Sequence, residues 1–279
     1  MKKCYLLAIV LSAMVLSFTV SCSKSEESTP TNPETPDNPI NHGDQMGVYN
    51  PGKKIKKVYQ EEWGENKKLL SVWNWTGNKL ESIDHYDDDG IWNYKEKFSY
   101  DEKNRLTHID YEGAPSNRYV DFEYNEDELV RVKDYSANGL QATFSFTNQN
   151  GKMTECVYRN SDFVNEFKVN WFWSSNNVEK YTGSMSTWTD MTTLLMSYDE
   201  KKNPFKGFLA PMVHFWVWSP RWEEEFLPYY MCWSENNITR LKIEEGGELD
   251  EIFRYVYDSD GFPISMDCDE WGLFYFEYE

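Results

Sequence analysis

The chain has 279 residues and a formal net charge of −19, with 47 acidic residues against 28 lysines and arginines. This negative field repels phosphate backbones, which argues against nucleic acid as a partner. Aromatic residues make up 17% of the sequence, enough for a sizeable core, and the acidic surplus keeps such a chain soluble.

Residues 1–21 have the features of an export signal. Lys2 and Lys3 precede an apolar run from Leu6 to Val20, which has the length of a signal peptide and is short for a membrane span. The run ends in FTVSC, which resembles a bacterial lipobox. The resemblance implies that Cys22 is acylated on sulfur and becomes the mature N-terminus. An ordinary signal peptide cleaved near Ser21 is the alternative.

Residues 22–50 are predicted to be a lipidated cysteine followed by a disordered tether. The stretch SKSEE, residues 23–27, resembles the export tag of Bacteroidetes surface lipoproteins, which implies an outer-membrane location with surface exposure. Four prolines follow among Ser, Thr, Asn and Asp, and few apolar residues are present to form a core. As a flexible coil, the tether spans roughly 30 Å.

After residue 50, one pattern recurs about every 25 residues. Its best example is FSYDEKNRLTHIDY, residues 98–111, with two aromatics one apart, a polar tetrad and an apolar pair three apart. Spacings of 22 to 35 residues between the second aromatics indicate a repeat architecture. These residues, the repeat aromatics, are Trp75, Tyr100, Tyr124, Phe146, Trp173, Tyr198, Trp233 and Tyr257.

Each unit predicts a β-hairpin. Apolar and polar residues alternate before the repeat aromatic, polar stretches such as DEKN and NEDE favour turns, and the apolar pair opens the return strand. The spacing of three within that pair breaks the alternation and predicts a bulge near each turn. About eight hairpins give roughly sixteen strands, and a sheet that wide must curl, split or close. We therefore predict an all-β antiparallel meander over residues 51–279, forming a closed or nearly closed up-and-down barrel.

The longest interval between units contains an insertion, residues 208–230, with three tryptophans as candidate ligand contacts. Trp216, Trp218 and Trp222 could form a platform that stacks on sugars or docks a protein. The alternative is that Trp216 and Trp218, two residues apart, face one side of another core strand.

Tyr100-Asp101, followed by Asn104-Arg105-Leu106, resembles the YD repeats of Rhs and teneurin proteins, and partial copies start at Tyr198 and Tyr257. The whole layout of signal, lipobox, proline-rich tether and hairpins is similar to a family of uncharacterised Bacteroidetes surface lipoproteins described as having a porin-like fold. The resemblance implies an antiparallel barrel and no known activity.

Metal and cysteine motifs are weak. The stretch from His85 to Glu96 fits an EF-hand frame loosely, but histidine is a poor calcium ligand and the flanks favour strands, so a plain acidic hairpin turn is the better interpretation. Cys156, Cys232 and Cys268 have no CxxC spacing. They allow either one disulfide and one free thiol or three buried thiols. We predict no metal and no cofactor.

No catalytic motif is present: the histidines are scattered, and GxSxG and Walker sequences are absent. We therefore predict a non-enzymatic binding or scaffolding protein. Its expected partners are outer-membrane lipid through Cys22 and a glycan or an envelope protein. A glycan-active hydrolase that uses a carboxylate pair is the alternative. Insertion of the barrel into the membrane is a weaker one, because many outward positions are charged.

Overall fold

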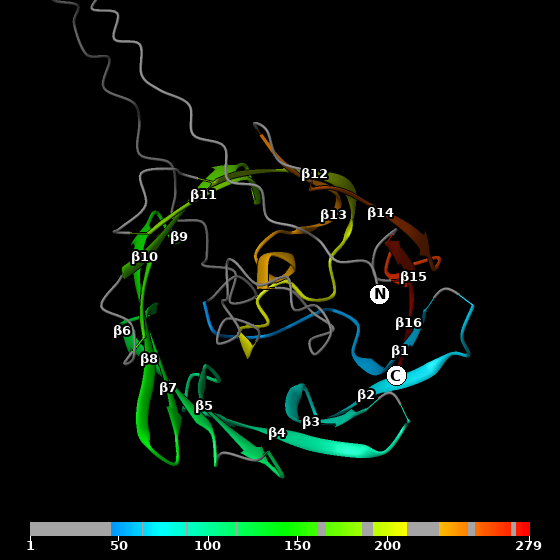
Figure 1. The fold of residues 1–279 in the computed structure, drawn as a ribbon, viewed down its shortest axis with the longest axis horizontal. Coiled ribbons are helices and arrows are strands. Elements are labelled where there is room, and N and C mark those ends of the chain that lie inside the picture. Colours follow the sequence, from blue (N-terminus) through cyan, green and yellow to red (C-terminus); the bar gives the residue numbers. More distant parts are fainter. Residues whose placement is uncertain are drawn as a thin grey trace, which may run out of the picture. The chain divides into compact units, whose positions relative to one another are not determined.

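The computed structural model describes residues 46–62, 64–87, 89–114, 117–160, 166–185, 192–210, 229–244, 249–268 and 272–279. Within these ranges sixteen strands pair antiparallel in chain order, and β16 returns to pair with β1, so the sheet closes into a barrel (Figure 1). The predicted all-β meander and its closure are confirmed. No helix in these ranges is long and apolar enough to cross a membrane.

The strands are β1 (Ile55–Glu61), β2 (Lys68–Thr76), β3 (Lys79–Tyr86), β4 (Trp92–Tyr100), β5 (Leu106–Glu112), β6 (Tyr119–Asn125), β7 (Glu128–Ser136), β8 (Gly139–Gln149), β9 (Lys152–Asn160), β10 (Glu166–Ser174), β11 (Asn177–Met185), β12 (Thr192–Lys202), β13 (Asn236–Ile243), β14 (Asp250–Tyr257), β15 (Pro263–Cys268) and β16 (Gly272–Tyr278).

A bulge next to the turn of each repeat hairpin explains the apolar pairs. In the β2–β3 hairpin Trp75 pairs with Leu80 and Asn74 with Ser82, so Glu81 is an extra residue. The extra residue places both Leu80 and Ile83 on the inner face, where each is 2% exposed. The register shifts directly before the repeat aromatic in β4–β5, β6–β7, β10–β11, β12–β13 and β14–β15 as well. The predicted bulges are confirmed.

The repeat aromatics join each hairpin to the one before it. The Tyr100 hydroxyl donates a hydrogen bond to the carbonyl oxygen of Leu80 at 2.6 Å. The acceptor is the first apolar residue of the preceding return strand, and the same contact recurs along the barrel. The further donor–acceptor pairs are Trp75–Ile55, Tyr124–Leu106, Trp173–Met153 and Tyr198–Val178. Phe146 has no donor, and Asn148 Nδ2 bonds the carbonyl oxygen of Leu129 at 2.9 Å instead.

A cation that precedes the acceptor residue lies over the ring of the next repeat aromatic. The Arg105 guanidinium is 4.4 Å from the Tyr124 ring centroid, and Lys152 Nζ is 5.2 Å from that of Trp173. Asp101 fixes Arg105, because its Oδ2 accepts from Arg105 Nε at 2.7 Å while its Oδ1 accepts two backbone N–H groups of the turn. Hence the Tyr-Asp…Arg-Leu pattern encodes a turn and a contact to the next unit.

The chain itself packs the inside of the barrel. Residues 46–54 and the segment after β12 run across the ring in Figure 1. The Tyr49 hydroxyl donates to the carbonyl oxygen of Pro204 at 2.7 Å, and Phe208 lies 5.1 Å from Tyr49 and 5.0 Å from Trp73 between ring centroids. The described chain therefore begins inside the barrel, at residues that the sequence prediction places at the end of the tether.

One predicted unit is wrong. Residues Tyr229–Cys232 form a 3₁₀ helix, η3, so the Met231–Trp233 stretch is not a strand. Neighbouring Met231 and Cys232 are both buried, which a single turn in the core allows and strand alternation does not. The eighth pair of strands is formed instead by β16 with β1. In β16 the Tyr278 hydroxyl makes the contact typical of a repeat aromatic, donating to the carbonyl oxygen of Pro263 at 2.7 Å.

The three cysteines of the described chain are free and buried, so of the two predicted alternatives the one with three buried thiols holds. The His85–Glu96 stretch forms the predicted acidic turn. Asp87 Oδ1 accepts hydrogen bonds from the backbone N–H groups of Asp89 at 3.1 Å and Ile91 at 2.8 Å.

Candidate functional site

The predicted site residues Cys22, Trp216, Trp218 and Trp222 lie outside the described residues. The lipidation site and the tryptophan platform therefore stay predictions.

The outward face of the barrel is polar. Ion pairs join neighbouring strands there: Arg131 with Glu123 at 2.9 Å, Arg159 with Glu166 at 2.6 Å, and Arg240 with Asp250 at 2.6 Å. The inward face carries the buried aromatic and aliphatic residues. A barrel wall that faces lipid has the opposite polarity, with an apolar band outside.

A polar group of side chains also faces inward. The His85 ring stacks on Tyr94 with centroids 4.4 Å apart, and His85 Nε2 lies 3.6 Å from Glu96 Oε2. The structure thus brings the two ends of the EF-hand-like stretch together across the β3–β4 hairpin. Within the described ranges, no three His, Cys, Asp or Glu side chains gather as a metal site would require.

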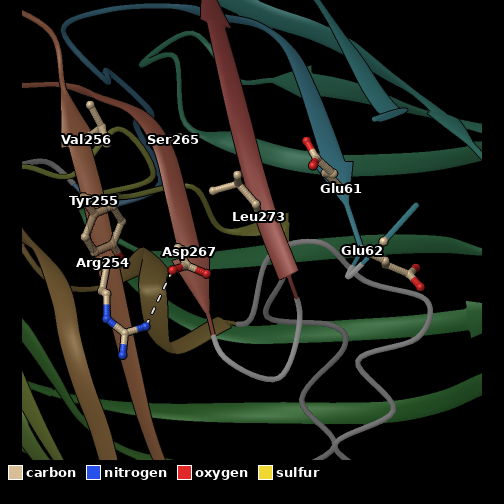
Figure 2. Close-up of a pocket in the computed structure, with 9 residues that line it drawn as sticks. Glu61, Glu62, Arg254, Tyr255, Val256, Ser265, Asp267 and Leu273 are labelled. Carbon is tan, nitrogen blue, oxygen red and sulfur yellow. Dashed lines mark ion pairs between the residues drawn. The ribbon is translucent and has the colours of Figure 1, made fainter. Parts of the chain in front are cut away.

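The outer face has a pocket of about 420 Å³ where β14, β15 and β16 meet the end of β1. In Figure 2, Leu273 of β16 lies between the Arg254–Asp267 ion pair on one side and Glu61 and Glu62 on the other. The volume falls within the range of about 300–1,000 Å³ typical of small-molecule sites. The lining residues are Glu61, Glu62, Gly64, Arg254, Tyr255, Val256, Ser265, Asp267 and Leu273.

Strand register arranges the pocket and the surface beside it as two rows of outward side chains. One row crosses the four strands as Glu61, Leu273, Asp267 and Arg254. The neighbouring row is Tyr59, Tyr275, Ser265 and Val256. Because adjacent strands are about 4.8 Å apart, each row forms a nearly continuous strip of side chains.

Several polar groups in the pocket and beside it contact one another. Arg254 Nη1 lies 3.6 Å from Asp267 Oδ2, and the Tyr275 hydroxyl donates a hydrogen bond to Glu61 Oε2 at 2.8 Å. The hydrogen bond to the Glu61 carboxylate raises the pKa of Tyr275. Lys67 Nζ lies 4.3 Å from the Tyr59 ring centroid and 4.2 Å from that of Tyr275. The pocket therefore combines carboxylates and one guanidinium, and beside it two tyrosine rings are covered by Lys67.

Sequence reasoning missed these residues. Tyr59 and Tyr275 meet only because β1 pairs with β16, and their positions lie outside the repeat pattern. A lysine and acidic residues beside half-buried tyrosines give no local signal that distinguishes a site from a solvated strand.

No protein-family model matches this sequence, and no curated protein matches it. Among solved structures, a porin-like protein from Bacteroides uniformis aligns with a TM-score of 0.55 at 11% identity, covering 84% of this chain and 100% of that chain. A porin-like protein from Bacteroides vulgatus aligns with a TM-score of 0.48 at 10% identity, covering 81% of this chain and 99% of that one. At 11% identity, the first likeness shows a shared barrel fold and nothing about activity.

Proposed function

We propose that the protein is a lipid-anchored barrel of the bacterial cell envelope that binds a partner on its outer face without catalysis. The observation that carries this proposal is the distribution of side chains. The chain's own aromatic residues pack the described interior, whereas the outer face carries an open pocket lined by polar groups. A packed interior of this kind favours surface binding over passage of solutes.

The cellular location is inferred from the N-terminal sequence. Cys22 follows a signal-like run, and a proline-rich stretch separates it from β1. The polar outer wall supports a barrel that stands beside the membrane, because charged strand faces would be costly in lipid. A lipid on Cys22 would then provide the membrane attachment, with the barrel exposed at the cell surface.

The partner classes that fit are a glycan or an envelope protein. The outer pocket offers hydrogen-bonding groups such as Ser265 and Asp267 beside the apolar side chains of Val256 and Leu273. This mixture suits a polar ligand with some apolar surface.

Two measurements on the full chain in a producing bacterium test the proposal. Labelled fatty acid should be incorporated into the wild-type chain and not into Cys22→Ser, and added protease should remove the wild-type chain from intact cells. A photo-crosslinking residue in place of Ser265 should trap a partner, and the same residue in place of Ser99 on β4 should not. Equal labelling of both chains would contradict the anchor, and equal trapping at both positions would contradict the binding face.

A further inference from the structure

The outer pocket has an acidic lining. Glu61, Glu62 and Asp267 contribute three carboxylates, against the single guanidinium of Arg254. The chain as a whole carries a formal charge of −19, so the surrounding field adds to this preference. Cationic ligands are attracted to such a site and anionic ligands are repelled.

The tyrosine pair beside the pocket already holds an ammonium group. Tyr59 and Tyr275 are register partners on β1 and β16, and Lys67 Nζ lies within 4.3 Å of both ring centroids. This distance is well inside the limit of about 6 Å for a cation–π contact. Lys67 itself belongs to the exposed connection between β1 and β2. The two rings are thus arranged to bind a cation, and the long side chain of Lys67 occupies their faces in this structure.

Apolar surface continues from the rings into the pocket. Leu273 lies next to Tyr275 on the same face of β16, and Val256 on β14 is 57% exposed. An alkyl chain that follows this strip would keep its ammonium group near the rings and the Glu61 carboxylate.

We propose that the pocket and the adjoining Tyr59–Tyr275 pair together bind an alkylammonium group, carried by a free diamine or by a lysine side chain of a peptide, and that Lys67 competes for the tyrosine rings. This inference rests on the proposed function, in which the outer face is the binding surface. The tyrosine rings and the carboxylates contact the ammonium group, and Leu273 and Val256 contact its alkyl stem.

Calorimetric titration of the full chain in detergent at low salt tests the inference, with cadaverine and Nα-acetyl-lysine methylamide as probes of the two sources. Lys67→Gln should raise the affinity for the better probe by roughly 5- to 30-fold, because two ring faces become free. Tyr59→Ala in that background should abolish the gain, and Tyr59→Phe should keep it, since the ring and not the hydroxyl makes the contact. Lys180→Gln is the matched control, because Lys180 lies 4.4 Å over the exposed Phe172 ring away from the pocket.

Tighter binding of cadaverine identifies a free amine as the ligand class, and tighter binding of the lysine derivative identifies a peptide. The inference is overturned if Lys67→Gln gains nothing, or if uncharged 1,5-pentanediol or maltoheptaose binds as well as the amines. Binding of maltoheptaose would leave the proposed function standing, because lipid labelling and crosslinking at Ser265 test that function separately.

Discussion

The hydroxyl of Tyr100 lies 2.6 Å from the carbonyl oxygen of Leu80, twenty residues earlier in the chain. The bond ties the β4–β5 hairpin to the β2–β3 hairpin at the level of the turns. Burial raises the pKa of Tyr100, so the phenol stays protonated as a donor at all physiological pH values.

Tyr100→Phe should therefore destabilise the barrel by about 1–3 kcal/mol, because it removes the donor and leaves the Leu80 carbonyl without it. Urea denaturation with an unchanged slope is the measurement. Tyr135→Phe is the control, since the Tyr135 ring stacks on Tyr119 at 4.6 Å on the outer face. Equal losses in the two variants would show that the bond to Leu80 does not stabilise the fold.

Arg105→Gln should lower the free energy of unfolding by about 1–2 kcal/mol. The guanidinium pairs with Asp101 Oδ2 at 2.6 Å and lies over the Tyr124 ring, and its side chain is only 12% exposed. Lys103→Gln should cost little, because the Lys103–Asp127 pair is solvent-exposed. A loss in Lys103→Gln as large as that in Arg105→Gln would contradict this ranking.

Phe208→Ala should destabilise the barrel by about 3–5 kcal/mol, because it opens a cavity among Tyr49, Trp73 and Phe98. Thermal or urea denaturation measures the change. Phe172→Ala, at a position that is 41% exposed on the outer face, should cost less than about 1 kcal/mol. If the two variants unfold alike, the segment after β12 does not contribute to the core.

The stability of the protein should depend on pH through His108. Partial burial lowers the pKa of His108, but hydrogen bonds to Asp121 at 2.7 Å and Asp110 at 3.2 Å outweigh it, so the pKa is raised above 6.5. A raised pKa in the folded state means that the contribution is complete below about 6.5 and is lost as pH rises through the folded value.

The wild-type chain should accordingly be more stable than His108→Asn at about pH 5.5, with the difference shrinking towards about pH 8.5. Urea denaturation of both chains across this range gives the result. A difference that stays constant or grows with pH would rule out the ionised histidine as its source.

The repeat made most of the fold predictable. Alternation before Tyr124 and the spacing of Leu106 and Ile109 report local hairpin geometry, and seven such hairpins are real. The prediction failed at Met231–Trp233 because these two apolar residues are separated by one position, as in a strand, although the chain there forms a 3₁₀ turn.

The outer site could not be predicted in the same way. Tyr59 and Tyr275 lie at opposite ends of the barrel sequence, and only closure of the sheet makes them neighbours. Register between distant strands is a non-local property, and a shift of β16 by one residue against β1 would place the two rings on opposite faces of the sheet.

Closure of β1 against β16 is thus the central claim, since both the fold and the pocket depend on it. Lys57 and Glu277 are register partners across this seam, so Lys57→Cys with Glu277→Cys, in a Cys22→Ser background, tests it by disulfide trapping. The control is Glu123→Cys with Arg131→Cys, partners within the β6–β7 hairpin. We predict that both pairs crosslink under mild oxidation; a crosslink in the hairpin pair alone would contradict the closed barrel.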